Sequence, residues 1–173
     1  MHYESISTNS NVGSEETAPE APTNLVVTSI SDAQIDLSWT DNSSDETKFR
    51  IERSPGGSTN WVEIDTAAAD ATTYSDIGLT ASTTYHYRVR AYRAAGGYAE
   101  AFSNYTNVDT EKTAPSAPSS LSVTTVSGAL SLALLWTDNS YDETNFRIER
   151  SPDGSTNWGE IDTAVPVATP YTD

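Results

Sequence analysis

The sequence predicts an all-β protein made of tandem, seven-stranded antiparallel β-sandwiches, and three observations support this fold class. The first is an internal repeat: residues 39–67 return at 136–164 with 25 of 29 positions identical. The second is a series of short runs in which apolar and polar residues alternate, the period of a half-buried strand. The third is that clusters of Gly, Pro, Asn, Asp and Ser separate these runs.

The repeat divides the chain into modules of roughly 100 residues, the size of one domain. Residues 4–22 align with 100–118, with ten of 19 positions identical, so the start of the chain belongs to the same period. We expect residues 1–16 to be the last strand of a preceding module or a donor strand. Residues 17–112 should form a complete domain, and residues 113–173 an incomplete one that holds its first five strands.

Each strand of the complete module has its own signal. Pro22 and Leu25 open the first, Ile35, Leu37 and Trp39 alternate along the second, and Phe49 leads the third. The fourth and fifth follow turns rich in Gly, Ser, Ala and Asp. We expect the seven strands near residues 24–30, 33–40, 47–54, 61–66, 72–75, 83–93 and 98–109.

The sixth strand carries the strongest alternation and should be central in its sheet. Tyr85, Tyr87, Val89 and Ala91 face one way, and His86, Arg88 and Arg90 face the other. In the second module, Leu132, Leu134 and Trp136 should face the core, and nothing in this chain corresponds to the sixth and seventh strands. Those strands would come from further sequence or from a neighbouring chain.

These residues resemble a known family, the fibronectin type III domain in its bacterial and archaeal style, an immunoglobulin-like sandwich. The resemblance rests on Pro22-x-x-Leu25, Trp39, Tyr74-x-Asp76-x-x-Leu79 and Thr83-x-Tyr85-x-Tyr87-x-Val89-x-Ala91. It implies structural roles for Trp39, Leu79, Tyr85, Tyr87 and Trp136. Tyr85 would be the corner tyrosine, with its hydroxyl hydrogen-bonded to backbone near Leu79.

Composition narrows the partners. The chain has no cysteine, which excludes disulfides and thiolate metal sites, and its 25 acidic against nine basic residues give a net charge of −16. This charge repels nucleic acid and anionic lipid. No apolar run reaches the ~20 residues that span a bilayer. His2 and His86 have no nucleophile at useful spacing, so we expect neither enzyme activity nor a cofactor.

An acidic loop is the one weak candidate for a metal site. It holds Asp41, Asn42, Asp45 and Glu46, and the second module repeats it as Asp138, Asn139, Asp142 and Glu143. Hard cations prefer such oxygen ligands. The spacing differs from that of the 12-residue calcium loop, and such clusters usually serve their own backbone, so the expected role is turn structure without a metal.

The remaining polar and aromatic candidates have structural explanations. Five arginines lie on neighbouring strands and should pair with Glu52, Glu63 and Asp65 on a solvated sheet face, with a site for a carboxylate ligand as the alternative. They are Arg50, Arg53, Arg88, Arg90 and Arg93. Trp61 and Trp158 should pack over a sheet edge, with stacking on carbohydrate as the alternative. Asn42 and Asn104 lie in glycosylation sequons, which matter if the source glycosylates surface proteins.

Two positions are candidates for contact between chains or modules. Ala133 and Leu135 replace the outward Asp36 and Ser38 of the first module, which makes that face of the second module apolar. If residues 4–12 act as a donor strand, Ile6 would enter a neighbour's core as Phe102 should in the intact module.

The resemblance implies an extracellular or cell-surface spacer or binding module. Our first hypothesis is a non-enzymatic structural module of a secreted or cell-surface fibre or filament, built from tandem domains. Its missing strands would come from further sequence of a longer array or, as the alternative, from strand exchange between chains. The alternative is a spacer or accessory region of an extracellular adhesin or carbohydrate-active enzyme. The partners would be other copies of the chain or adjoining modules of the same polypeptide.

Residues 18–112 expressed alone should fold, because they contain all seven strands and both halves of one core. Chemical denaturation followed by tryptophan fluorescence should then show a single cooperative transition. A broad, non-cooperative transition would contradict these module boundaries.

Overall fold

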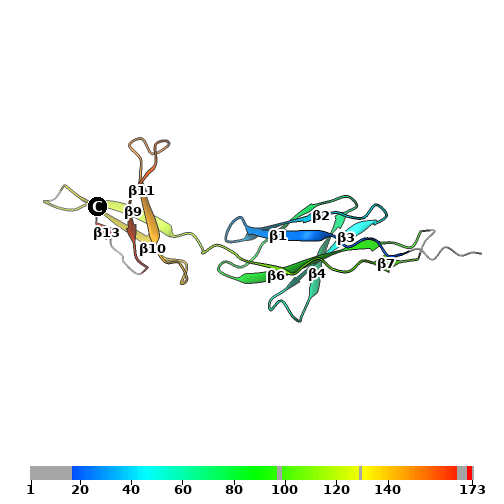
Figure 1. Ribbon diagram of the computed structural model, residues 1–173. Coiled ribbons are helices and arrows are strands. Elements are labelled where there is room, and N and C mark those ends of the chain that lie inside the picture. Colours follow the sequence, from blue (N-terminus) through cyan, green and yellow to red (C-terminus); the bar gives the residue numbers. More distant parts are fainter. Residues whose placement is uncertain (1–16, 97–98, 129, 167–170, 173) are drawn as a thin grey trace, which may run out of the picture.

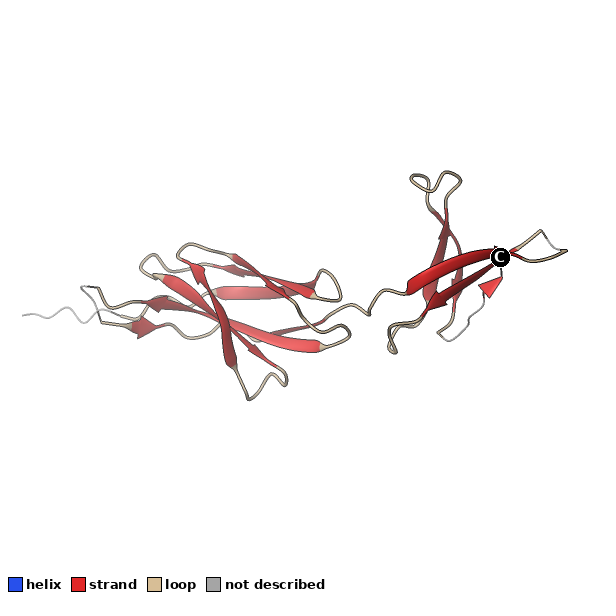
Figure 2. Ribbon diagram, turned by 180° about the vertical axis from the view of Figure 1, so that it is seen from behind, coloured by secondary structure: helices blue, strands red, loops and turns tan. Residues whose placement is uncertain are grey.

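The computed structural model describes residues 17–96, 99–128, 130–166 and 171–172. Every regular element in these ranges is a strand, as Figure 2 shows, which confirms the all-β fold class. Two bodies are joined by the extended residues 113–118 (Figure 1). The described part of the chain contains no helix that is long and apolar enough to cross a membrane.

The first body is a sandwich of two antiparallel sheets. One sheet has the order β1-β2-β5, and the other has the order β4-β3-β6, with β7 and β8 both pairing with β6. The first six strands lie within two residues of the predicted bounds. They are β1 (Thr23–Ser29), β2 (Gln34–Thr40), β3 (Lys48–Ser54), β4 (Val62–Ala68), β5 (Thr73–Ile77) and β6 (Thr84–Arg93).

The predicted seventh strand, 98–109, is wrong as a single element. It is divided into β7 (Ala101–Phe102) and β8 (Asp109–Lys112), with irregular backbone between them. In that interval the side-chain hydroxyls of Ser103 and Thr106 accept hydrogen bonds from the backbone N–H groups of Ala91 (2.8 Å) and Val89 (3.0 Å). These hydroxyls take the place of carbonyl acceptors, so β6 remains hydrogen-bonded without a regular ladder.

Side chains from the same interval close the edge of β1 across the sandwich. The amide of Asn107 accepts from Leu25 N and donates to Leu25 O, each at 3.1 Å. The carboxylate of Asp109 accepts from Val27 N at 2.9 Å. These bonds satisfy polar groups that an edge strand would otherwise offer to another chain.

The core of the first sandwich follows the predicted alternation. Trp39 packs on Phe49 with ring centroids 5.5 Å apart, and Tyr87, Val89 and Ala91 of β6 are fully buried. Its buried apolar residues are Leu25, Val27, Ile35, Leu37, Trp39, Phe49, Ile51, Tyr87, Val89 and Ala91. Burying a side chain of this kind stabilises the fold by ~1.5–3 kcal/mol.

A buried carboxylate that strand alternation alone does not predict joins the two sheets. Asp76 on β5 is 6 % exposed and accepts hydrogen bonds from the Tyr87 hydroxyl at 2.9 Å and from Arg53 Nη1 at 2.7 Å. Burial and the Asp76 charge raise the pKa of Tyr87, so its hydroxyl stays protonated and donates. The sequence does indicate this contact, because Asp76 and Arg53 both stand at core-facing positions of their strands. The placement of Arg53 on the solvated face was therefore wrong.

Tyr85 lies near the predicted corner, but its hydrogen bond is exposed to solvent. Its hydroxyl accepts from the backbone N–H of Thr80 at 3.1 Å, one residue beyond Leu79. The ring lies 5.1 Å from the Arg53 guanidinium. Of the two tyrosine hydroxyls, that of Tyr87 is the buried one.

The second body has five strands among its described residues. They are β9 (Ser119–Thr125), β10 (Leu132–Thr137), β11 (Phe146–Arg150), β12 (Gly159–Ala164) and β13 (Tyr171–Thr172), in the sheets β9-β10-β13 and β11-β12. Trp136 and Ile148 are buried, but Leu132 is 38 % exposed, so its predicted core position was wrong. Its counterpart Ile35 belongs to the buried cluster that includes Tyr87 and Val89 of β6, and the described part of the second body has no strand equivalent to β6.

Replacing Tyr87 with Phe should lower the free energy of unfolding by ~1–3 kcal/mol, because Asp76 loses one buried donor. Tyr85→Phe should cost less than ~1 kcal/mol, because water can replace the exposed bond. Denaturant titration of both variants measures the difference. Equal shifts of the two midpoints would show that the buried carboxylate does not depend on Tyr87.

Candidate functional site

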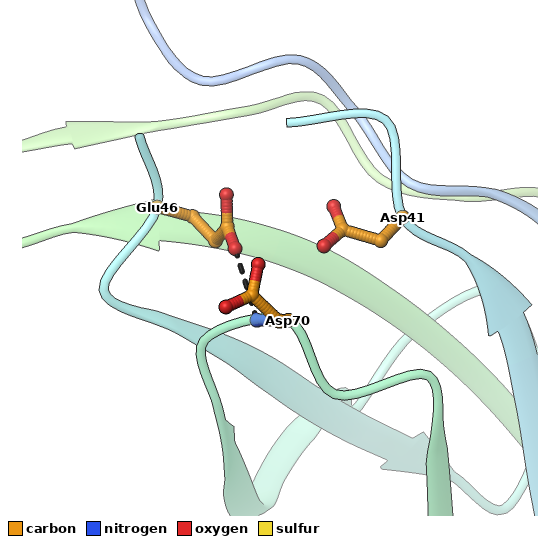
Figure 3. A group of neighbouring side chains, drawn as sticks. All are labelled: Asp41, Glu46 and Asp70. Atoms are coloured by element: carbon orange, nitrogen blue, oxygen red, sulfur yellow. Dashed lines mark hydrogen bonds between the residues drawn. The ribbon is translucent and has the colours of Figure 1, made fainter. Parts of the chain in front are cut away.

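Three carboxylates meet at one pole of the first sandwich (Figure 3). Asp41 follows β2, Glu46 precedes β3, and Asp70 lies in the turn between β4 and β5. One carboxylate oxygen from each lies within 4.8 Å of the others. Glu46 is 7 % exposed, and its Oε1 accepts a hydrogen bond from Asp70 N at 3.1 Å. The structure thus brings together two of the four predicted loop residues and adds a third from a distant turn.

The other two residues of the predicted set do not join this cluster. Asp45 forms an ion pair with Arg93, whose side chain is 5 % exposed, so Arg93 also lies off the solvated face where we expected it. Asn42 donates its amide to Ala21 O at 2.8 Å and to Thr23 Oγ1 at 3.0 Å. A glycan on the Asn42 amide would disrupt both bonds.

The same asparagine contact recurs at the second module. Asn139 donates its amide to Ala117 O at 2.8 Å and to Ser119 Oγ at 3.0 Å. In both modules the acidic loop therefore holds the segment that enters the module. The aspartate before each asparagine serves its own turn, since Asp41 Oδ1 accepts from Ser43 N at 3.0 Å. Asp138 Oδ1 accepts from Ser140 N in the same way.

The arginine face of β3 and β6 is half buried, which corrects the expectation of a solvated face. At its centre, Glu52 is 7 % exposed. Its carboxylate accepts from Arg88 at 2.6 and 2.9 Å and from the Tyr105 hydroxyl at 2.7 Å, and it lies 3.5 Å from Arg90. Burial and the bond to Glu52 raise the pKa of Tyr105.

An aromatic layer covers this charged centre. The Arg88 guanidinium lies 3.7 Å from the centroid of Tyr105 and 4.3 Å from that of Trp61. Arg90 lies 4.3 Å from the centroid of Phe102. Phe102 therefore packs on the outer face, so its predicted insertion into the core was wrong. Cation–π contacts of this kind desolvate the arginines and leave little of the face open to a ligand.

The apolar positions predicted on the second module lie on β10. Leu135 is 50 % exposed and Ala133 is half buried. A shallow groove on this module is lined by Leu121, Leu134, Trp136 and Phe146, among others. Trp158 is 55 % exposed, in contrast to Trp61 over Arg88. Ile6, the predicted donor-strand residue, lies outside the described residues.

The junction between the two modules is made by polar groups. Asp142, the counterpart of Asp45, binds the Ser82 hydroxyl and the Lys112 ammonium group of the first module. These two contacts lower the pKa of Asp142 to about 2, so the carboxylate stays charged at neutral pH. The position that pairs with Arg93 within the first module thus links the two modules in the second.

The described residues assemble no catalytic constellation. His86 Nδ1 lies 2.7 Å from Thr110 Oγ1, and its ring packs close to Gly57. Asn104, the second sequon, is exposed on the irregular segment between β7 and β8. The described side chains form ion pairs, a cluster of carboxylates of the kind that bind cations, and contacts between the two modules.

The chain is similar in sequence to a known domain family and to regions of two bacterial enzymes. The family model of the fibronectin type III domain matches residues 20–108. An alpha-amylase of Niallia circulans is 43 % identical over 82 residues, which cover 46 % of this chain and 6 % of that protein. Exoglucanase B of Cellulomonas fimi is 32 % identical over 120 residues, 67 % of this chain and 10 % of the exoglucanase. The chain therefore spans a tenth or less of these relatives.

A solved structure shows the same fold. The two-domain fibronectin type III segment of chicken tenascin is 20 % identical, with a TM-score of 0.51 over 88 % of this chain and 82 % of the tenascin segment. At this identity the likeness concerns the fold alone.

Replacing Glu52 with Ala should cost ~2–4 kcal/mol of unfolding free energy, because Arg88, Arg90 and the Tyr105 hydroxyl lose their buried acceptor. Glu63→Ala is the matched control. Its ion pair with Arg50 is more exposed and should be worth less than ~1 kcal/mol. Comparable losses in the two variants, measured by denaturation, would contradict the central role of Glu52.

Proposed function

This chain belongs to the fibronectin type III domain family, and we propose that it is a non-catalytic spacer region of an extracellular protein. Its role is to hold adjoining parts of a polypeptide at a set distance. The relatives named alpha-amylase and exoglucanase B support an accessory role in a carbohydrate-active enzyme and a location outside the cell.

The junction between the modules is the observation that carries this proposal. Asn139 fixes the backbone of the connecting segment at Ala117, while Asp142 binds Lys112 and Ser82 of the preceding module. Proline at 115 and 118 further restricts the segment. A flexible tether needs none of these contacts, whereas a spacer of defined length benefits from each.

Electron-spin distance measurement tests the spacer role. The chain has no native cysteine, so labels can be attached at Ser58→Cys and at the repeat-equivalent Ser155→Cys, both in exposed turns. We expect a narrow distance distribution that broadens at least twofold when Lys112→Ala and Asn139→Ala are combined.

Asn42→Ala provides the matched control, because it removes the same amide contact from the entry of the first module. It should leave the label distance unchanged. A broad distribution in the parent chain would contradict the spacer proposal.

A second candidate function is a fibre subunit completed by strand exchange. It is favoured by apolar side chains on the second module that the first module buries: Leu121 is 64 % exposed where its counterpart Leu25 is 2 % exposed. Val123, at 54 %, compares with Val27 at 6 %. We propose that strands equivalent to β6 and β8, supplied by another copy of the chain, cover this face.

Sedimentation analysis distinguishes the two candidates. Concentration-dependent assembly of the chain, abolished by Ile6→Asp, would support strand exchange. A chain that stays monomeric up to high micromolar concentration would exclude the fibre and leave the spacer.

A further inference from the structure

The acidic pole of the first sandwich contains a buried carboxylate oxygen without a partner. Glu46 Oε1 is satisfied by Asp70 N, but Glu46 Oε2 is buried and has no hydrogen-bond donor among the described residues. Figure 3 shows the Glu46 carboxylate close to those of Asp41 and Asp70. Leaving a charged oxygen unsatisfied in the interior is costly, so a positive ligand at this point would stabilise it.

In the described part of the chain, no lysine or arginine supplies that charge. None of the ion pairs among the described residues joins Asp41, Glu46 or Asp70 to a lysine or arginine. The nearest loop carboxylate, Asp45, is paired with Arg93. The fold thus holds three carboxylates against their mutual repulsion.

The second module repeats part of this arrangement. Glu143, the counterpart of Glu46, also has a buried Oε2 without a hydrogen-bond partner among the described residues. Asp138 stands where the first module has Asp41, but the position equivalent to Asp70 is Val167 in the sequence. Because two modules orient the same glutamate inward, its unsatisfied oxygen is a property of the repeat, and only the first module adds the third carboxylate.

We propose that Asp41, Glu46 and Asp70 bind one divalent cation and that this cation is Ca²⁺. Calcium takes oxygen ligands at ~2.3–2.6 Å, so two ligands of one ion can be up to ~5.2 Å apart. The three oxygens lie within 4.8 Å of one another, inside that limit. The ion would offset the buried charge of the Glu46 carboxylate and would tie the loop before β3 to the turn before β5.

Calcium binding to the whole chain is the direct test. After treatment with EDTA, equilibrium dialysis with radioactive calcium at fixed ionic strength should give one saturable site per chain, half-filled at or below ~1 mM. The thermal midpoint should rise with the same saturation curve. Potassium chloride at matched ionic strength should not raise it.

Three variants assign the site. Asp70→Asn should abolish saturable binding without harming the fold, because position 70 is exposed and its positive φ of 62° suits asparagine. Glu46→Gln should do the same. Asp32→Asn, in the turn between β1 and β2 at the opposite pole, removes one charge elsewhere and should bind calcium as the parent does.

The proposal also predicts the direction in which Asp70→Asn changes the thermal midpoint when calcium is absent. In EDTA, Asp70→Asn should have a thermal midpoint equal to or above that of the parent, because the variant removes one of three repelling charges. Absence of saturable calcium binding up to 10-fold above ~1 mM would overturn the proposal. Binding that survives both Asp70→Asn and Glu46→Gln would overturn it as well.

Discussion

The pairing of the two sheets depends on the buried carboxylate of Asp76. It belongs to β5 in one sheet, while its two donors, Tyr87 and Arg53, belong to β6 and β3 in the other. An aliphatic core can tolerate small shifts between sheets, because dispersion and apolar burial have little direction. A buried charge cannot, since a shift that separates it from its donors leaves it unsatisfied. The carboxylate therefore fixes how the sheets lie against each other.

The same constraint explains how an acidic chain uses its few cations. In the first module, Arg53 and Arg93 reach inward to carboxylates, and Arg88 and Arg90 converge on Glu52. These arginines all form ion pairs within the first module. The unpaired acidic residues that give the net charge of −16 therefore lie on the remaining surface and at the ends of the sandwich. At the junction between the modules, Lys112 forms an ion pair with Asp142. At the opposite pole of the first module, the three clustered carboxylates have no basic partner among the described residues.

Alternation along the strands was enough to predict six strands of the first module and most of its core. It failed at the seventh strand, where the side-chain hydroxyls of Ser103 and Thr106 accept hydrogen bonds from β6 in place of backbone carbonyls. An alternation of apolar and polar residues cannot predict such side-chain bonds. The Asp76 contact could have been found from its core-facing position. The cluster of Asp41, Glu46 and Asp70 could not, because Asp70 is distant in sequence and its turn conformation brings it to the loop.

The two copies of the repeat show which properties of a strand depend on its own sequence and which depend on neighbouring strands. Leu25 and Leu121 are equivalent residues on equivalent strands, each paired with the same kind of partner strand, yet one is buried and the other exposed. The difference arises across the sandwich, where β6 and β8 pack against β1, whereas β9 packs mainly against β10 among the described strands. Strand formation is therefore local, whereas burial depends on the opposing sheet.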